Sequence, residues 1–215
     1  MRYYLSTVKF QARRKSPMAD SYHHGDLRRA LLDEASAVLE SGGVSALSLR
    51  DLARRAGVSA TAPYHHFKGK SDLVCALAED ALQHLDAALA IPTHADPHER
   101  LRAMGVAYVM FAVAHPERFR LAFRPELGAN PFEDFRMDGS TPVDEIVAYR
   151  RLVGAVREIE PDEQQQAALA MAAWGMVHGL AALFVDGPLR PLTEDPDRVR
   201  AMAEAAIARM NLGAE

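Results

Sequence analysis

The stretch Ser48–Lys70, SLRDLARRAGVSATAPYHHFKGK, constrains the fold more than any other part of this chain. Its first half repeats apolar residues at helical spacing and carries arginines on the opposite face, which predicts a short amphipathic helix. Gly57 lacks the β-carbon that disfavours left-handed backbone, so it is expected to end that helix. The Ser59 hydroxyl is expected to cap a second short helix, and Pro63 lies near the start of that helix, where a missing N–H costs little. Helix, glycine turn and helix form the helix-turn-helix pattern.

The ordered residues of this region resemble the DNA-binding half of the tetracycline-repressor-like (TetR) family of bacterial regulators. The resemblance covers Ser48–Leu77 and rests on the Leu-Arg-Asp-Leu-Ala helix, the Ala56–Ser59 turn, the Tyr64–Phe67 segment and Lys70 at the start of a long helix. It implies a protein that binds double-stranded DNA, with phosphates held at the positions of Tyr64 and Lys70. The alternative is a small three-helix packing unit that needs a glycine turn for purely structural reasons.

Charge is divided unevenly along the chain. Residues 1–70 hold 12 Lys and Arg against 6 Asp and Glu, whereas residues 71–215 hold 13 against 23. A basic head on an acidic body is typical of a protein that presents one end to a polyanion. The second helix of the motif lacks Arg, Asn and Gln, so specificity is expected to rest more on fit and DNA shape than on bidentate base contacts. The predicted DNA contacts are Ser48, Arg50, Ser59, Ala60, Thr61, Ala62, Tyr64, His65, Lys68 and Lys70.

The rest of the chain is predicted to be helical, because no segment alternates as a half-buried strand does. Apolar stripes bounded by Pro, Gly or acidic residues predict helices over 26–41, 71–91, 98–114, 116–123, 143–160, 162–186 and 197–210. Ser71 is expected to cap the second of these, which belongs to both halves of the protein. The predicted fold is therefore all-α, with a basic arm over 1–20, a three-helix helix-turn-helix domain over 21–70 and a helical bundle for ligand binding and dimerisation over 71–215.

Two stretches lack helical periodicity. Residues 1–20 either lie along DNA or are disordered, and Met18 is an alternative start. Residues 124–142 contain three prolines and two glycines. A loop of that length is usually functional or mobile, so a flap beside a cavity is predicted, with simple disorder as the alternative.

The 162–186 helix combines an uncharged stretch with a regular pattern of small residues. Residues 167–185 are near the length that spans a bilayer, but they are rich in Ala and Gly and have no flanking Lys or Arg. A helix buried on all sides in a soluble, cytoplasmic bundle is therefore expected, with no membrane partner. Spacings of three and four predict a seam that admits another helix, either at a homodimer interface with the 199–210 helix or within one subunit. The seam residues are Ala168, Ala172, Gly175, Gly179 and Ala182.

The segment Trp174–Gly179, WGMVHG, resembles the Trp-His-Gly signature of one C-terminal subgroup of the same family. A lone histidine on such a helix is more often a core residue than a ligand-binding one, but Trp174 lies four residues before His178 on nearly the same face. With aromatic and Met residues of other helices, they are predicted to line a mostly apolar cavity for a small-molecule effector, or to be core. Arginines nearby would meet an acidic ligand. The predicted cavity residues are Met104, Tyr108, Phe111, Arg120, Arg124, Trp174 and His178, with Phe184 beside them.

Together these features predict a ligand-responsive transcriptional regulator, with a repressor favoured, that binds a pseudo-palindromic operator as a dimer and is released by a small molecule. A constitutive DNA-binding protein without a ligand is the first alternative, and an enzyme that uses the cavity is the less favoured one. The sequence has no His-Glu-x-x-His, Gly-x-Ser-x-Gly or phosphate-loop pattern, and its adjacent histidine pairs point apart on a helix. No catalytic residue, metal or cofactor is therefore predicted. The single cysteine, Cys75, excludes an intrachain disulfide.

Overall fold

The computed structural model describes residues 24–92, 96–123 and 147–209. Every regular element within these ranges is a helix, which confirms the all-α prediction. The predicted 1–20 arm, the 124–142 stretch and Arg124 lie outside the described residues. The α-helices are α1 (His24–Gly42), α2 (Leu49–Arg55), α3 (Lys70–Ala88), α4 (Pro97–Ala114), α5 (Pro116–Ala122), α6 (Val147–Arg157), α7 (Glu163–Val185) and α8 (Pro196–Ile207), and short 3-10 helices are η1 (Val44–Ala46), η2 (Ala62–His65) and η5 (Arg190–Glu194).

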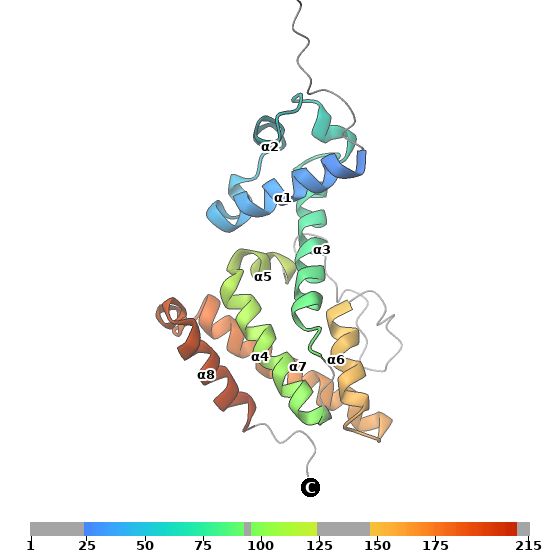
Figure 1. The fold of residues 1–215 in the computed structure, drawn as a ribbon, viewed down its shortest axis with the longest axis vertical. Coiled ribbons are helices and arrows are strands. Elements are labelled where there is room, and N and C mark those ends of the chain that lie inside the picture. The colour runs from blue at the N-terminus through green and yellow to red at the C-terminus, as the bar shows by residue number, and fades with distance from the viewer. Residues whose placement is uncertain (1–23, 93–95, 124–146, 210–215) are drawn as a thin grey trace, which may run out of the picture.

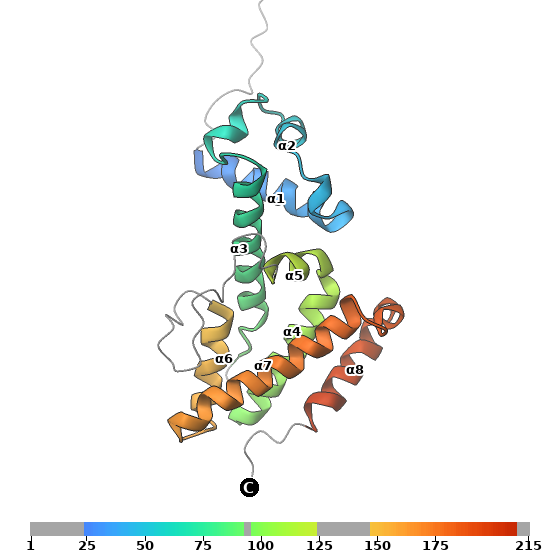
Figure 2. The ribbon, with the colours of Figure 1, turned by 180° about the vertical axis from the view of Figure 1, so that it is seen from behind.

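The helices form a small head and a larger body joined by α3. Figure 1 shows α1 and α2 at one end of the molecule, α3 running along the long axis, and α4 to α8 at the other end. From behind, α7 crosses the body with α8 beside it and α6 near its opposite end (Figure 2).

The head is held together by the apolar stripes that the sequence predicts. Leu31 and Leu39 of α1, Leu52 of α2 and Leu73 of α3 are fully buried in one cluster. Phe67, which follows η2, is also buried there with 1% of its surface exposed. The cluster therefore contains a side chain from each part of the helix-turn-helix unit.

The turn of this unit differs in part from the prediction. Ser48 caps α2 by accepting from the Asp51 amide at 3.4 Å, and Gly57 has the expected left-handed φ of 68°. The second helix is only the 3-10 helix η2, with Thr61 as its N-cap and Pro63 in its first turn, where proline is tolerated. The Ser59 hydroxyl lies 3.1 Å from that of Thr61, so the prediction that it caps a helix is wrong.

The start of α3 also differs from the prediction. The helix begins at Lys70, one residue earlier than expected, with Gly69 as its N-cap. Asp72 accepts a hydrogen bond from the Lys68 amide at 2.8 Å, which ties the preceding loop to the first turn. The prediction that Ser71 caps this helix is therefore wrong.

The apolar face of α3 is shared between head and body. Leu73 and Leu77 belong to the head cluster, whereas Leu85 belongs to the body cluster that also contains residues of α4, α6 and α7. The expectation that this helix serves both halves is confirmed. α5 makes a second connection, because its Leu121 is buried in the head cluster and its Phe119 in the body cluster.

The helix α7 is not buried on all sides, so that expectation is wrong for a single subunit. Its most apolar window has a mean hydropathy of 1.8, yet only 28% of that window is buried. Among the described helices it alone is long and apolar enough to cross a membrane, a test that core helices of soluble proteins also pass. The uncovered face contains the small-residue stripe, in which Ala168, Ala172, Gly175 and Gly179 are exposed and Ala182 is half-buried.

An ion pair links α1 to the middle of α3. Arg29 donates to the Asp80 carboxylate at 2.9 Å, and the Asp80 side chain is 7% exposed whereas that of Arg29 is 55% exposed. His84 Nδ1 lies 3.2 Å from the other carboxylate oxygen. A buried carboxylate requires such partners, because its desolvation is unfavourable without them.

Replacing Arg29 with Met should lower the free energy of unfolding by about 1 to 2 kcal/mol, less than for a fully buried pair because Arg29 is half in solvent. Urea denaturation at fixed protein concentration would measure it. The matched control is Arg54→Met, which removes an ion pair whose two side chains are 74% and 59% exposed. The control should change stability by no more than about 0.5 kcal/mol. Equal losses in the two variants would contradict the role given to Asp80.

Candidate nucleic-acid interface and apolar cavity

The head presents a polar surface on the segment that includes η2. Pro63 and Phe67 are buried and anchor this segment from below, while Thr61 and His65 are exposed and Tyr64 has 56% of its surface exposed. Pro63 and Phe67, four residues apart, therefore face inward, and Thr61, Tyr64 and His65 face outward. The outward side chains offer hydroxyl, imidazole and aromatic groups that can reach a nucleic-acid groove or backbone.

Cations surround this surface. Arg50, Lys68 and Lys70 are all exposed. Lys70 Nζ donates to the Ser45 carbonyl at 3.3 Å, which holds the ammonium beside the first turn of α3. The free amides at a helix start and a nearby ammonium together favour a phosphate.

All ten predicted contacts lie in the described part of the head. Eight of them are exposed, and the other two, Ser48 and Ala62, are half-buried. The structure adds Arg28 on α1, whose guanidinium lies 5.5 Å from the centre of the Phe67 ring. The sequence offered no signal for Arg28, because it is one exposed charge on a helix outside the helix-turn-helix motif. The exposed eight are Arg50, Ser59, Ala60, Thr61, Tyr64, His65, Lys68 and Lys70.

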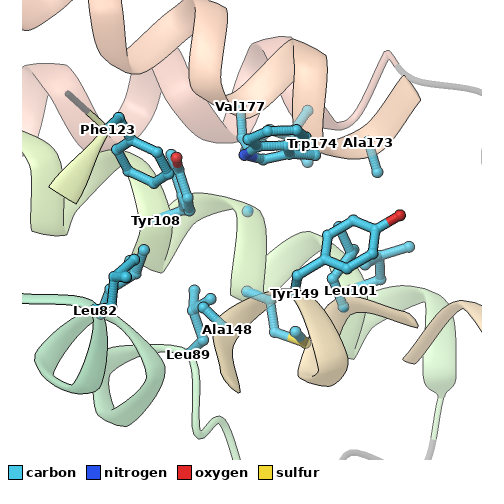
Figure 3. A pocket seen from close by; sticks show the side chains of 15 residues that line it. Leu82, Leu89, Leu101, Tyr108, Phe123, Ala148, Tyr149, Ala173, Trp174 and Val177 are labelled. Atoms are coloured by element: carbon cyan, nitrogen blue, oxygen red, sulfur yellow. The ribbon is translucent and has the colours of Figure 1, made fainter. Parts of the chain in front are cut away.

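A cavity lies in the body between α3, α4, α6 and α7 (Figure 3). It encloses about 700 Å³, part of which is open to solvent. Three predicted residues line it, namely Met104, Tyr108 and Trp174. The other described lining residues are Leu82, Leu85, Leu89, Leu101, Gly105, Phe123, Ala148, Tyr149, Leu152, Ala173, Val177 and Ile207.

Half of the lining residues that the sequence did not single out come from α3, from Leu89 directly after it, and from α6. Leu85 and Leu89 were assigned to an ordinary core stripe, and Ala148, Tyr149 and Leu152 lie on a helix without any distinguishing motif. Periodicity places them on an apolar face but cannot separate a core from a cavity wall.

The prediction was wrong for three of the described residues. Phe111 lies beside His115, with ring centres 5.3 Å apart, and faces a groove between α4 and α8 instead of the cavity. Phe184 is fully buried in a separate cluster with Val199 and Ile207. Arg120, the third, lies on α5 and contacts the C-terminal end of α7, outside the cavity.

Arg120 is bound to the C-terminal end of α7. Its guanidinium donates to Asp186 at 2.7 Å and to the Val185 carbonyl at 3.1 Å, and it also pairs with Glu117. The last carbonyls of a helix attract a cation, so this arginine is already neutralised outside the cavity.

His178 contacts the cavity through Tyr108. The Tyr108 hydroxyl lies 2.8 Å from His178 Nδ1, and it is also hydrogen-bonded to the Trp174 side chain. The rings of Phe119 and Phe123 lie 5.3 and 4.9 Å from the imidazole centre. Figure 3 shows the indole nitrogen of Trp174 directed toward Tyr108. Tyr108 of α4 thus connects Trp174 and His178, the two residues that the sequence motif brings together on α7.

Burial keeps this network uncharged. It lowers the pKa of His178 below its usual value of 6.5 and raises the pKa of Tyr108. Both groups are therefore neutral at neutral pH. Among the described residues, no cluster of three or more His, Cys, Asp or Glu side chains could hold a metal ion.

Comparison with known proteins gives two adjacent family matches. Residues 31–77 match the family described as bacterial regulatory proteins of the tetR family, and residues 101–210, about half of the chain, match the tetracyclin repressor-like C-terminal domain. The chain belongs to the TetR family of bacterial transcriptional regulators. The Trp-His-Gly subgroup stays a prediction.

Among individual proteins, this TetR-family chain is similar over most of its length to a solved protein of unknown function from Rhodococcus sp. RHA1. The two are 34% identical with a TM-score of 0.67, and the match covers 89% of this chain and 98% of that one. It is also 37% identical over 79 residues to the HTH-type transcriptional regulator BetI of Rhizobium meliloti, covering 36% of this chain and 39% of BetI. Identity to the HTH-type transcriptional activator FasR of Mycolicibacterium smegmatis is 32% over 106 residues, 48% of each chain. The chain thus spans about half the length of these curated relatives, or less.

The lowered pKa of His178 predicts a pH dependence of stability. Below about pH 6.5 the unfolded chain binds a proton at this histidine that the folded chain resists, so stability falls as the pH falls. The variant His178→Gln should lose less stability than the parent between pH 7.5 and 5.5. Urea denaturation at both pH values measures the two changes, and the difference between parent and variant isolates this group. Parallel losses in both proteins would show that His178 protonates equally in the folded and unfolded states.

Proposed function

We propose that this TetR-family chain is a ligand-responsive repressor that binds a pseudo-palindromic operator as a homodimer and is released by a small molecule in the apolar cavity. The course of α3 carries the proposal. Lys70 at its start faces the predicted DNA surface, and Leu82, Leu85 and Leu89 further along it line the cavity. One rigid helix, α3, therefore connects the two sites. The protein would bind its DNA in the cytoplasm.

The DNA contact is assigned to the ten head residues named above. Tyr64 and Lys70 would hold phosphates, and Thr61 and Ala62 would face base edges. Their exposure supports this assignment, because a contact surface must be free of packing within its own domain.

Homodimerisation is assigned to the exposed small-residue stripe of α7, with α8 beside it. A β-carbon placed on Gly175 or Gly179 would meet nothing within 4 Å, so the helix surface there is open in a single subunit. Leu183 on the same helix is 44% exposed. A second helix that covers this face would bury apolar surface and set the two heads about 34 Å apart, as successive major grooves require.

Coupling between the sites would pass through α5 as well as α3. Phe119 and Phe123 contact Tyr108, with ring centres 6.0 and 6.4 Å away. Leu121, two residues after Phe119, packs in the head core. Arg118, on the same helix, has its Nε 3.3 Å from the Glu40 carboxylate of α1. Some ligands would bind more tightly when the two heads are not at the spacing that DNA requires. Such a ligand weakens DNA binding, and DNA weakens the binding of that ligand by the same factor.

The two alternatives are less well supported. A constitutive DNA-binding protein would not require a cavity with a buried polar network beside it. An enzyme would require a nucleophile, general base or charged group in the cavity, and the described lining residues include only two tyrosines of that kind.

The DNA assignment is tested by binding to the duplex upstream of the chain's own gene and to an unrelated duplex. Lys70→Ala should weaken binding to both and reduce the slope of log K against log salt by about 1, because one phosphate contact is lost. Tyr64→Ala should also weaken binding to both. The control is Arg190→Ala on η5 of the body, an exposed arginine outside the head, which should leave both slopes unchanged. An unaltered slope in Lys70→Ala would remove Lys70 from the interface.

The dimer assignment is tested by one substitution made on two helices. Gly179→Leu should weaken the dimer by about tenfold or more in sedimentation equilibrium, since the added side chain occupies the space that a partner helix would need. The control is Gly154→Leu on α6, another exposed helical glycine whose added β-carbon also meets nothing within 4 Å. The control should remain dimeric, and both variants should keep their helix content because Leu favours helix over Gly. A fully dimeric Gly179→Leu protein would place the interface elsewhere.

A further inference from the structure

We infer that the cavity takes an uncharged, mainly hydrocarbon molecule with one hydrogen-bonding group, such as a medium-chain alcohol, and rejects its carboxylate and ammonium analogues. The inference rests on the proposed function only in treating this cavity as the effector site. It assigns a chemical class to that effector from the charges and hydrogen bonds around the cavity.

The described part of the cavity wall offers no charge to a ligand. Of the fifteen described lining residues, none has an ionised side chain at neutral pH, and eleven are aliphatic residues, methionine or glycine. A carboxylate or ammonium group placed among them would lose its hydration without gaining an opposite charge, and that loss is unfavourable.

Three described arginines that neighbour wall residues in the sequence are already paired. Arg100 and Arg102 flank the lining residue Leu101, but they pair with Glu158 and Glu99 respectively. Arg151 precedes the lining residue Leu152, and its guanidinium holds both oxygens of Asp86 at 2.7 and 2.8 Å. An anionic ligand would have to break such a pair before it could use the arginine, so these cations do not create an anion site.

One polar group of the wall has capacity for a ligand. A tyrosine hydroxyl can make three hydrogen bonds, one as donor and two as acceptor. At Tyr108, His178 and Trp174 occupy two of them, which leaves one position that no described residue occupies. Whether that position donates or accepts depends on the His178 tautomer. An alcohol fits either case, because its own hydroxyl both donates and accepts.

The ligand test uses the full chain and its own fluorescence. Trp174 is the only tryptophan, and it forms part of the wall, so its emission reports directly on cavity occupancy. The probes are 1-decanol, decanoate and decylammonium at pH 7.5 and micromolar concentrations, which share one chain length and differ in charge. Decanol should produce a saturable change, and each charged probe should bind at least about tenfold more weakly. Decanoate or decylammonium binding as tightly as decanol would overturn the inference, as would a decanol titration without saturation.

The hydrogen bond is tested separately with Tyr108→Phe. This variant should bind decanol about three- to tenfold more weakly, because one neutral hydrogen bond is lost. Unchanged decanol affinity in a folded variant would overturn the assignment of the polar group to Tyr108. If the variant fails to fold, the charge series on the parent protein still decides the ligand class.

Failure of this inference can be told apart from failure of the proposed function by operator release. The same three probes are added to the protein bound to its upstream DNA. If a charged probe releases the DNA and decanol does not, the charge rule fails while the repressor assignment stands. If the protein binds decanol selectively but does not bind the DNA, the ligand class stands and the repressor assignment fails.

Discussion

The apolar face of α3 is buried in two hydrophobic cores, and the relation between head and body depends on this sharing. Leu73 and Leu77 are buried among head residues, and Leu85, two turns further on, is buried among body residues and lines the cavity. An α-helix transmits displacement along its axis with little bending, because its backbone hydrogen bonds resist deformation. The buried Asp80, paired with Arg29 of α1, holds the head against the same helix. In the proposed function, this helix is the route by which a change in packing around Leu85 reaches the head.

The distribution of charge separates the two sites in the same chain. On the head, exposed Lys and Arg side chains remain available to a polyanion. In the body, Arg151, which precedes the lining residue Leu152, is neutralised by Asp86, and Arg120, outside the cavity, is neutralised by Asp186. The cavity wall is left with apolar side chains and the neutral Trp174–Tyr108–His178 network. Some of the acidic residues of the body thus neutralise its arginines, and none of the described cavity-lining residues is acidic.

Much of the head was predictable because its signals are local. The left-handed Gly57 and the apolar stripe of α1 depend on residues within a few positions of each other, and the structure confirms both. The predictions that failed required knowledge of competing local chemistry or distant neighbours. Ser59 does not cap a helix because the second helix begins only after Thr61, and the Ser59 hydroxyl lies beside the Thr61 hydroxyl instead. Arg120 does not reach the cavity because α5 places it at the end of α7, which no spacing in the sequence encodes.

By itself, the sequence determined which segments are helical, where most of them begin and end, and that one end of the molecule is basic, because these follow from periodicity, capping and composition. Only the tertiary structure decided which side of each apolar face meets a cavity and which meets a core. Helical periodicity places Tyr108 and Phe111 on the apolar side of the same helix. In the structure Tyr108 contacts α7, whereas Phe111 faces the groove beside α8. That choice depends on how the helices cross, and the crossing is set by the combined packing of side chains from all of them.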